Sequence, residues 1–359
     1  MSFLPVYING IGLISPQKTA ETKDFLTDIV EYTSDYLKCI DPNYKSYIEP
    51  LAARRMSRMI KMGIAAARMA LADAGCGMPD AIITGTGLGS VEDTEKILGS
   101  MVTGESLLNP TPFMQSTYNT ISSQIAITLK CHGYNSTYVH RTFSFESGLF
   151  DGLMQIAEKS AANVLAGGID EMTLVHLNIV RRLGDFKMLP ESNLGILDYK
   201  TPGAIAGEGS GFFLLGKDKK ENTYCTLSGV KTFYKPQSYL QSAGTIHSFL
   251  ESHGVEIPQL DLVILGLNGD KTQDSVYGEI AGLVYPGVPQ AYYKHLCGEY
   301  HTSSAFALWM AANILKRQSV PPAVQLRPSA NPGAPIRNVL IHNHYRNINH
   351  SLILLSAQI

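Results

Sequence analysis

Strand-like and helix-like segments alternate along this chain, and the alternation limits its possible folds more than any other feature. Residues 6–14 mix apolar and small residues in a strand-like pattern, and a helix pattern with apolar steps of three and four follows from Arg54 to Ala74. The next segments are strand 81–85, helix 91–101, strand 136–140, helix 146–159 and strand 163–168. Because such alternation is typical of parallel strands joined by crossover helices, we predict a layered α/β fold.

The second half of the chain repeats this theme. Its segments are strands 212–215 and 224–230, helix 239–253, strand 262–267, helix 303–317, and strands 339–341 and 352–355. Charge and polarity rise between Lys217 and Asn222, but no low-complexity linker separates the halves. We therefore predict one fused unit with halves at residues 1–218 and 219–359.

Composition narrows the classes of function. A hydrophobic fraction of 45% in 359 residues is ample for a large core. The charged fraction is 17% and the net charge is -2, so we expect no nucleic-acid partner. The 5 cysteines are scattered without a Cys-x-x-Cys pair, which argues against a disulfide framework and a zinc site. Without a basic leader or a membrane-length apolar run, we expect a cytoplasmic location and no membrane span.

Glycine-rich and polar motifs stand at the ends of several of these segments. The sharpest are Ala166-Gly167-Gly168 and Gly207-Glu208-Gly209-Ser210-Gly211. Four others are found at residues 7–16, 54–67, 85–89 and 112–119. Together, and in this order, the motifs resemble those of the β-ketoacyl-acyl-carrier-protein synthase family of the thiolase superfamily. The resemblance implies a thiolase-like fold, a duplicated sandwich of five αβαβα layers.

The resemblance also implies a cysteine nucleophile on a tight turn at a helix N-terminus, where the helix dipole lowers the thiol pKa. Counting from Gly133, or back from the Ala-Gly-Gly motif, places that position on Thr142. An alcohol needs an adjacent general base to react, so Thr142 is a poor substitute. Ser144 lies on the same turn, but placing it there would shift the apolar face of the following helix. For either hydroxyl, helix capping or a turn at the helix start is favoured over nucleophilic catalysis.

The two histidine positions of the family are also changed. The first follows a buried strand and is Asn268, which cannot shuttle a proton near pH 7. The second follows a Lys-x-x-x-Gly pattern, and here Lys294 and Gly298 precede Glu299. A carboxylate disfavours decarboxylation of a malonyl group at this place because it opposes the developing negative charge. We therefore predict no catalytic residue and no cofactor, with only the lysine retained.

Other histidines flank or follow these positions. His295 and His301 lie on either side of Glu299, and three more histidines cluster near the C-terminus: His342, His344 and His350. The alternating pair at 342 and 344 lacks a third ligand fixed by the sequence, so we do not expect a metal site.

The C-terminal turn differs from the family as well. A Phe-Gly-Phe-Gly-Gly run ahead of an Asn is replaced by residues 344–348, which include Tyr345 and Arg346. The chain is also short between Val230 and Leu262, where synthases carry an additional active-site loop. Because Tyr and Arg occupy volume that a substrate would need, we predict a filled or remodelled pocket.

A retained scaffold without catalytic groups resembles the chain length factor, the inactive partner of a ketosynthase. The resemblance implies a heterodimer joined through the strand at 136–140, with residues 112–119 reaching the partner. Phe113, Met114 and Tyr118 would then line or end the partner's acyl tunnel, and packing at the interface is an equal alternative. The pathway expected is fatty-acid or polyketide-type, making an aryl polyene or a flexirubin-like pigment.

Two other functions stay open on the sequence alone. One is an acyltransferase or hydrolase that uses Thr142 or Ser144, and the other is a homodimeric acyl-binding or assembly protein. An acidic acyl carrier protein could contact surface arginines, although solvated or ion-paired arginines are the more common case. The candidates are Arg54, Arg55, Arg58, Arg181 and Arg182.

Overall fold

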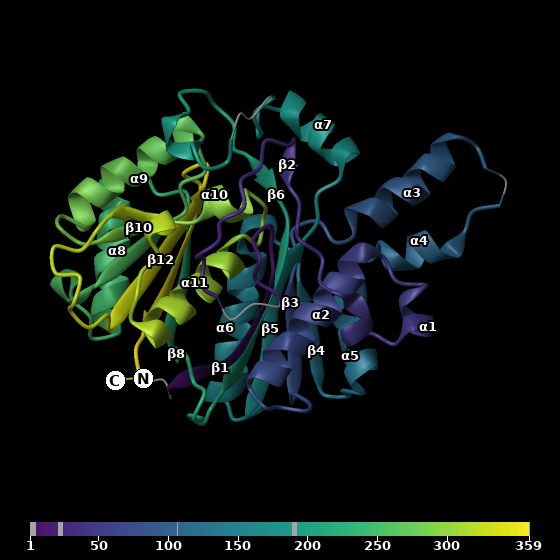
Figure 1. The fold of residues 1–359 in the computed structure, drawn as a ribbon, viewed down its shortest axis with the longest axis horizontal. Coiled ribbons are helices and arrows are strands. Elements are labelled where there is room, and N and C mark those ends of the chain that lie inside the picture. The colour runs from purple at the N-terminus through teal and green to yellow at the C-terminus, as the bar shows by residue number, and fades with distance from the viewer. Residues whose placement is uncertain (1–4, 21–23, 106, 189–191, 359) are drawn as a thin grey trace.

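The computed structural model describes residues 5–20, 24–105, 107–188 and 192–358. Their main sheet has 11 strands in the order β11-β10-β9-β12-β13-β8-β1-β7-β5-β3-β4 (Figure 1). The first-half strands are β1 (Val6–Ile14), β3 (Ala81–Gly85), β4 (Tyr134–Tyr138), β5 (Asn163–Asp170) and β7 (Gly209–Gly216). The second-half strands are β8 (Cys225–Tyr234), β9 (Leu262–Leu265), β10 (Gln290–Tyr292), β11 (Gln325–Arg327), β12 (Asn338–Tyr345) and β13 (Asn349–Ser356). A separate pair joins β2 (Tyr36–Leu37) to β6 (Ala206–Gly207).

The two halves share one strand arrangement. In the first, β7 is antiparallel to β1 and β5, while β3 is parallel to β5 and β4. In the second, β13 is antiparallel to β8 and β12, while β9 is parallel to β12 and β10. This repeat confirms the duplicated architecture. The division at residue 218 falls in the connection between β7 and β8 and stays a proposal.

The expected parallel pairing does not extend to β7 and β13, each of which is antiparallel to both of its neighbours. The crossover argument applies only where a helix carries the chain back to the same end of the sheet. β13 instead follows β12 through a tight hairpin turn, whose residues Arg346 and Asn347 both have positive φ. A strand pattern in the sequence does not record this direction.

The strands of the two halves form two layers of the fold, and helices form the three other layers. α2 (Arg58–Asp73) and α5 (Thr120–Leu129) pack on the first-half strands, and α8 (Tyr239–Ser252) packs with α9 (Lys271–Val284) on the second half. Between the halves lie α6 (Ser144–Ala157) and α11 (Ser304–Arg317), both of which contact strands of each half. Residues 304–315 of α11 are all buried, as expected for a helix that is largely apolar around its whole circumference. The layers therefore follow the predicted αβαβα order.

Several predicted boundaries require correction. The helix expected from Arg54 is interrupted, since α1 (Pro50–Ala53) ends there and α2 begins at Arg58. The strand expected at 136–140 lies two residues earlier, as β4. Helices without a prediction are α4 (Pro110–Gln115), α5, α7 (Leu174–Arg182), α9 and α10 (Lys294–Cys297).

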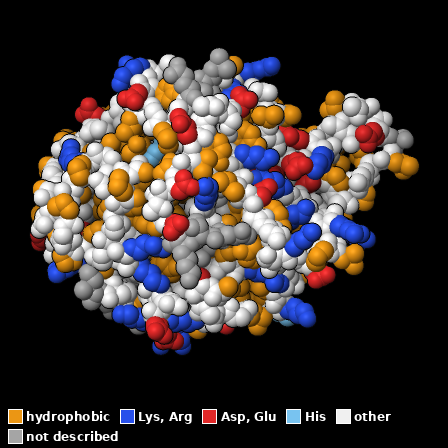
Figure 2. Space-filling model, in the orientation of Figure 1, with side chains coloured by type: hydrophobic (Ala, Val, Ile, Leu, Met, Phe, Trp, Pro, Cys, Tyr) orange, Lys and Arg blue, Asp and Glu red, His pale blue; other side chains and the backbone are white. Residues whose placement is uncertain are grey.

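One pair of helices projects from the body. α3 (Val91–Val102) and α4 form an arm at the right of Figure 1, and Figure 2 shows hydrophobic side chains on this lobe. No helix within the described ranges has the length and apolar character needed to cross a membrane.

Candidate functional site

Thr142 lies in the turn between β4 and α6, as the sequence predicts for the nucleophile position. Arg141 has a φ of 49°, and residues 141–143 form a short 3-10 turn before α6 begins. The Thr142 side chain is nearly buried, and its Oγ1 accepts a 2.8 Å hydrogen bond from Nδ2 of Asn349, at the start of β13. An amide therefore occupies the place beside the hydroxyl that a general base would need.

Ser144 is used by the backbone of the same turn. Its Oγ donates a 2.8 Å hydrogen bond to the Arg141 carbonyl and accepts one of 2.8 Å from the His140 N–H. The side chain is fully buried. The hydroxyl therefore stabilises the turn before α6 and caps no N–H group of the helix itself, so of the two expected structural roles the turn is the one observed.

Asn268, Lys294 and Glu299 meet through hydrogen bonds. Asn268 follows β9, Lys294 begins α10, and Glu299 is the second residue after α10. Both Nδ2 of Asn268 and Nζ of Lys294 donate to Oε2 of Glu299, at 2.7 and 2.6 Å. The Lys294 side chain is 1% exposed and that of Glu299 is 14% exposed, so this ion pair is largely shielded from water. Three of the four predicted positions thus form one cluster.

Two acidic residues that the sequence analysis missed surround Lys294. Asp274 of α9 accepts backbone hydrogen bonds of 2.9 Å from both Asn268 and Gly269, and burial raises its pKa to about 6. Glu146 of α6 accepts a 2.9 Å bond from Ser351, and burial raises its pKa as well. The nearby Lys294 opposes both shifts. The only sequence signal for Glu146 is its position one helical turn after Thr142.

A small cavity of about 70 Å³ adjoins Glu299, and Asp170, His301 and Tyr345 help to line it. Asp170 accepts hydrogen bonds from the N–H groups of Gly87 and Thr302, and burial raises its pKa. Burial lowers the pKa of His301, whose ring lies so close to Gly87 that a Cβ there would be 2.2 Å from it.

This cavity has the volume of only a few water molecules, because a liquid water fills about 30 Å³. The expected filling of the pocket therefore agrees with the structure at Tyr345, whose ring meets that of His301 edge-on at 6.5 Å. Arg346 is not among the residues that line the cavity, and its guanidinium pairs with Asp185, a residue of the cavity wall.

The C-terminal histidines are buried on β12 and β13. His342 Nε2 lies 3.4 Å from His350 Nδ1, while His344 Nε2 lies 3.1 Å from the Gln273 carbonyl. Burial lowers the pKa of His342 to about 3 and that of His350 to about 4. Within the described part of the chain, no group of three His, Cys, Asp or Glu side chains is placed to hold a metal ion.

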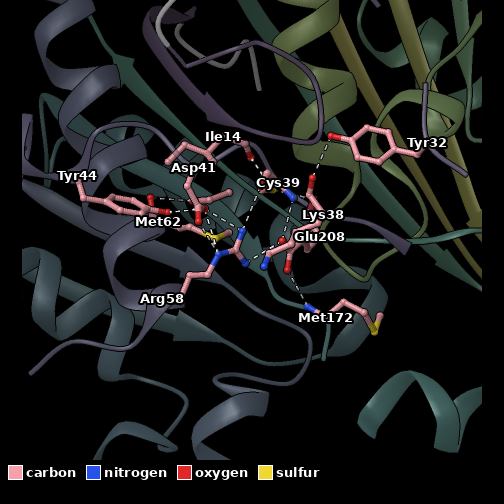
Figure 3. A network of polar contacts seen from close by, with 11 residues as sticks. Ile14, Tyr32, Lys38, Cys39, Asp41, Tyr44, Arg58, Met62, Met172 and Glu208 are labelled. Atoms are coloured by element: carbon pink, nitrogen blue, oxygen red, sulfur yellow. Dashed lines mark hydrogen bonds and ion pairs between the residues drawn. The ribbon is translucent and has the colours of Figure 1, made fainter. Parts of the chain in front are cut away.

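Glu208 of the glycine-rich motif ties the cavity wall to the N-terminal segment (Figure 3). Its carboxylate accepts hydrogen bonds from the N–H groups of Cys39, at 2.9 Å, and Met172, at 3.2 Å, and pairs with Arg58 at 2.8 Å. Arg58 also pairs with Asp41 at 2.9 Å. These contacts fix Met172, a residue of the cavity wall, and give the motif a structural role.

The same contacts decide which arginines remain available at the surface. Arg58 is engaged by two carboxylates, and Arg181 is buried, with an ion pair to Asp35. Both arginines are therefore already engaged by carboxylates of the chain itself. Arg54, Arg55 and Arg182 are exposed.

Comparison with known proteins identifies the family to which this fold belongs. The family model for the β-ketoacyl synthase N-terminal domain matches residues 6–221, which is more than half of the chain. The chain belongs to the β-ketoacyl synthase family.

Solved structures agree with this family assignment. The ishigamide ketosynthase/chain length factor has a TM-score of 0.81 at 18% identity, covering 99% of both chains. A β-ketoacyl synthase from Burkholderia phymatum STM815 has a TM-score of 0.80 at 16% identity, covering 99% of this chain and 100% of that one. A ketosynthase in complex with its chain length factor, from Xenorhabdus doucetiae, has a TM-score of 0.79 at 15% identity, covering 99% of this chain and 98% of that one. No curated protein sequence matches the chain.

The three residues predicted to contact a partner subunit lie on the projecting arm of this β-ketoacyl synthase family member or next to it. Phe113 and Met114 of α4 are 62% and 58% exposed, and Tyr118 is 50% exposed. Tyr118 is held by its own chain, because its ring lies over Gly89, where a Cβ would be 2.7 Å from it. The side chains of Phe113 and Met114 are therefore more accessible to a partner subunit than that of Tyr118.

Proposed function

We propose that this chain is a non-catalytic ketosynthase-like subunit that pairs with an active β-ketoacyl synthase and shapes its acyl tunnel, as a chain length factor does. The observation that carries the proposal is the Asn268–Glu299–Lys294 cluster. An ion pair and an amide occupy the positions where condensation needs two imidazoles. Thr142 offers no thiol, so these three positions hold neither the nucleophile nor the proton-transfer groups of a condensing enzyme.

The free edge of the sheet supports a heterodimer. β4 is the last strand of the 11-stranded sheet, so its outer backbone groups can pair with a strand of another subunit. Tyr134 and Val139, on and just after β4, are 44% and 41% exposed. Two of the similar structures are described as a ketosynthase with its chain length factor, which supports this kind of partner.

The arm supports a role in setting product length. Its apolar side chains are exposed to an extent that is unusual for a surface without a partner. They include Met101, Val102, Leu107, Phe113 and Met114, at 58–89% exposure. A bulky side chain inserted into a partner's tunnel limits how much acyl chain fits there. We assign this role to Phe113 and Met114, and interface packing to Tyr118, within a pathway that makes an aryl polyene or flexirubin-like product.

Co-expression with any intact ketosynthase that is encoded near this chain tests the proposal. The two proteins should purify together, and Phe113→Ala or Met114→Ala should lengthen the products by at least one extension unit without separating the two subunits. Leu283→Ala is the matched control, because Leu283 is a 49% exposed leucine on α9, away from the arm. A chain that stays monomeric or homodimeric, and that leaves the product lengths of this ketosynthase unchanged, would contradict the proposal.

The alternative of rewritten acyl chemistry has its own test. Intact-mass measurement after incubation with acyl thioesters should show no acyl-enzyme adduct. An adduct that is lost in Thr142→Ala or Ser144→Ala would support an acyltransferase or hydrolase instead.

A further inference from the structure

Two buried carboxyl groups meet at the base of the projecting arm. Asp93 belongs to the first turn of α3 and is 3% exposed, and Glu171, directly after β5, is 6% exposed. Lys96 approaches Asp93 only to 3.9 Å, and in the described ranges no Lys or Arg forms an ion pair with Glu171. Because a buried carboxylate is costly without a counter-charge, this junction disfavours two negative charges.

One hydroxyl group serves both carboxyl groups. Oγ of Ser90 lies 2.7 Å from Oδ2 of Asp93 and 3.2 Å from Oε1 of Glu171. A serine hydroxyl has a single proton to donate, and the shorter distance assigns it to Asp93. The contact with Glu171 is then a hydrogen bond only if Glu171 is protonated and donates to Ser90. The distances therefore fit one carboxylate and one carboxylic acid on either side of Ser90.

The surroundings of Glu171 also favour the protonated form. The titratable groups that face it from α3, β2 and the residue between β6 and β7 are Glu92, Asp93, Lys96, Tyr36 and Glu208. Burial raises the pKa of Glu171 to about 7, with smaller contributions from the charges of Glu92 and Glu208. The N–H group of Glu92 donates a 3.0 Å hydrogen bond to Glu171, which opposes this shift without cancelling it. Lys96 is held by Glu92 at 2.7 Å.

The same junction joins the arm to the body of the molecule (Figure 1). α3 and α4 pack mainly on each other, and no residue of α4 is buried. Gly89 and Gly104, on either side of α3, have positive φ values of 66° and 73°, so the backbone on both sides of the helix adopts conformations that glycine permits at little cost. Side-chain hydrogen bonds tie the arm to the body at Ser90, Glu95 and Gln115. With so few ties, the contact at Ser90 has a large share in holding the arm.

We infer that a proton shared by Glu171 and Asp93 through Ser90 latches the arm to the body, and that loss of this proton lets the first turn of α3 open. The arm carries Phe113 and Met114, so the latch would also govern how these two residues are presented to a partner subunit. That consequence rests on the proposed function, whereas the latch itself is a property of the isolated chain.

Hydrogen exchange of the isolated full-length chain tests the latch. When α3 opens, Glu171 meets water and regains a pKa near 4.5, so the proton favours the closed form at low pH and this contribution is lost as the pH rises through 7. After correction for the intrinsic pH dependence of exchange, protection of residues 91–97 should fall at least tenfold between pH 5 and pH 7. Glu171→Gln keeps a donor for Ser90 and an acceptor for Glu92, so its protection should stay constant.

A second variant separates proton sharing from burial alone. Asp93→Asn frees the Ser90 proton for Glu171, so the loss of protection between pH 5 and pH 7 should shrink to less than threefold. Glu105→Gln is the matched control, because it removes an exposed carboxylate of the same arm away from the base, and it should behave as wild type. An Asp93→Asn chain with the full wild-type loss would show that Glu171 holds its proton by burial alone, which overturns the shared latch.

The remaining outcomes distinguish this inference from the proposed function. Constant protection in the wild type between pH 5 and pH 7 overturns the inference, as does a Glu171→Gln chain that loses protection like the wild type. Either result leaves the proposed function standing if the chain still binds a ketosynthase. A chain that shows the expected exchange but binds no ketosynthase contradicts the proposed function alone and supports the latch.

Discussion

Lys294 donates a 2.6 Å hydrogen bond to Glu299, and its ammonium group is almost completely buried. We propose that the pair lies where an active β-ketoacyl synthase carries its catalytic site. Because a buried charge is costly without its counter-charge, the two residues depend on each other for stability. We propose that Glu299 makes this site a structural element of the fold.

Removing Glu299 should therefore destabilise the chain strongly. We expect Glu299→Ala to lower the free energy of unfolding by about 3 kcal/mol, because Lys294 loses its ion pair and Asn268 loses its acceptor. Urea unfolding followed by circular dichroism measures this change. The exposed pair of Lys96 with Glu92 is the control, and Glu92→Ala should cost about 0.5 kcal/mol or less. Equal effects of the two substitutions would show that burial does not strengthen the Lys294 pair.

His295 should make the chain less stable in acid. Burial lowers its pKa from 6.5 to about 4, so the unfolded state binds a proton in this range while the folded state does not. Stability then falls as the pH drops from 6.5 to 4, by about 1.4 kcal/mol per pH unit. His295→Gln should reduce this loss, measured as the difference in unfolding free energy between pH 6.5 and 4.5. The exposed His132→Gln should leave it unchanged, and an unaltered pH dependence in His295→Gln would contradict the prediction.

Glu171 should act in the opposite direction. Burial raises its pKa from 4.5 to about 7, so the folded state keeps a proton that the unfolded state has lost. Its contribution is complete below pH 4.5 and disappears as the pH rises through 7. As the pH rises across this range, the free energy of unfolding of Glu171→Gln should increase relative to wild type by about 1.4 kcal/mol per pH unit. Unfolding titrations of both proteins at pH 5 and pH 8 measure the gain, and a constant difference at the two pH values would refute the assignment.

Restoring the three family residues should not restore condensation. The triple variant Thr142→Cys, Asn268→His, Glu299→His regains a thiol and two imidazoles, but the adjoining cavity of about 70 Å³ stays too small for an acyl chain. Incubation with acyl and malonyl carrier-protein thioesters should give no extended product by mass spectrometry. Extension by this variant would show that side-chain identity alone, and not the filled pocket, prevents catalysis.

The sequence was sufficient to predict the family and the five layers. Those features follow from local patterns and from motifs whose order along the chain the family shares. α9 also left a signal that was missed, because its buried residues Val276, Tyr277, Ile280 and Val284 follow helical spacing.

Other features depend on contacts between distant parts of the chain. The approach of Glu146 to Lys294 joins two residues almost 150 positions apart and leaves no local pattern. Among the described residues, β8 pairs with β1 only from Cys225 to Leu227, and the strand pattern at 224–230 does not specify this length either. Such pairings are fixed by the packed fold, so they could be seen only in the structure.

We propose above all that this scaffold no longer condenses acyl groups by itself. The decisive experiment incubates the purified chain, free of any ketosynthase, with acyl and malonyl carrier-protein thioesters and follows the products by mass spectrometry. We predict no extended product from the chain alone, and products of altered length when the partner ketosynthase is added. Extension of the acyl thioester by the isolated chain would contradict this proposal.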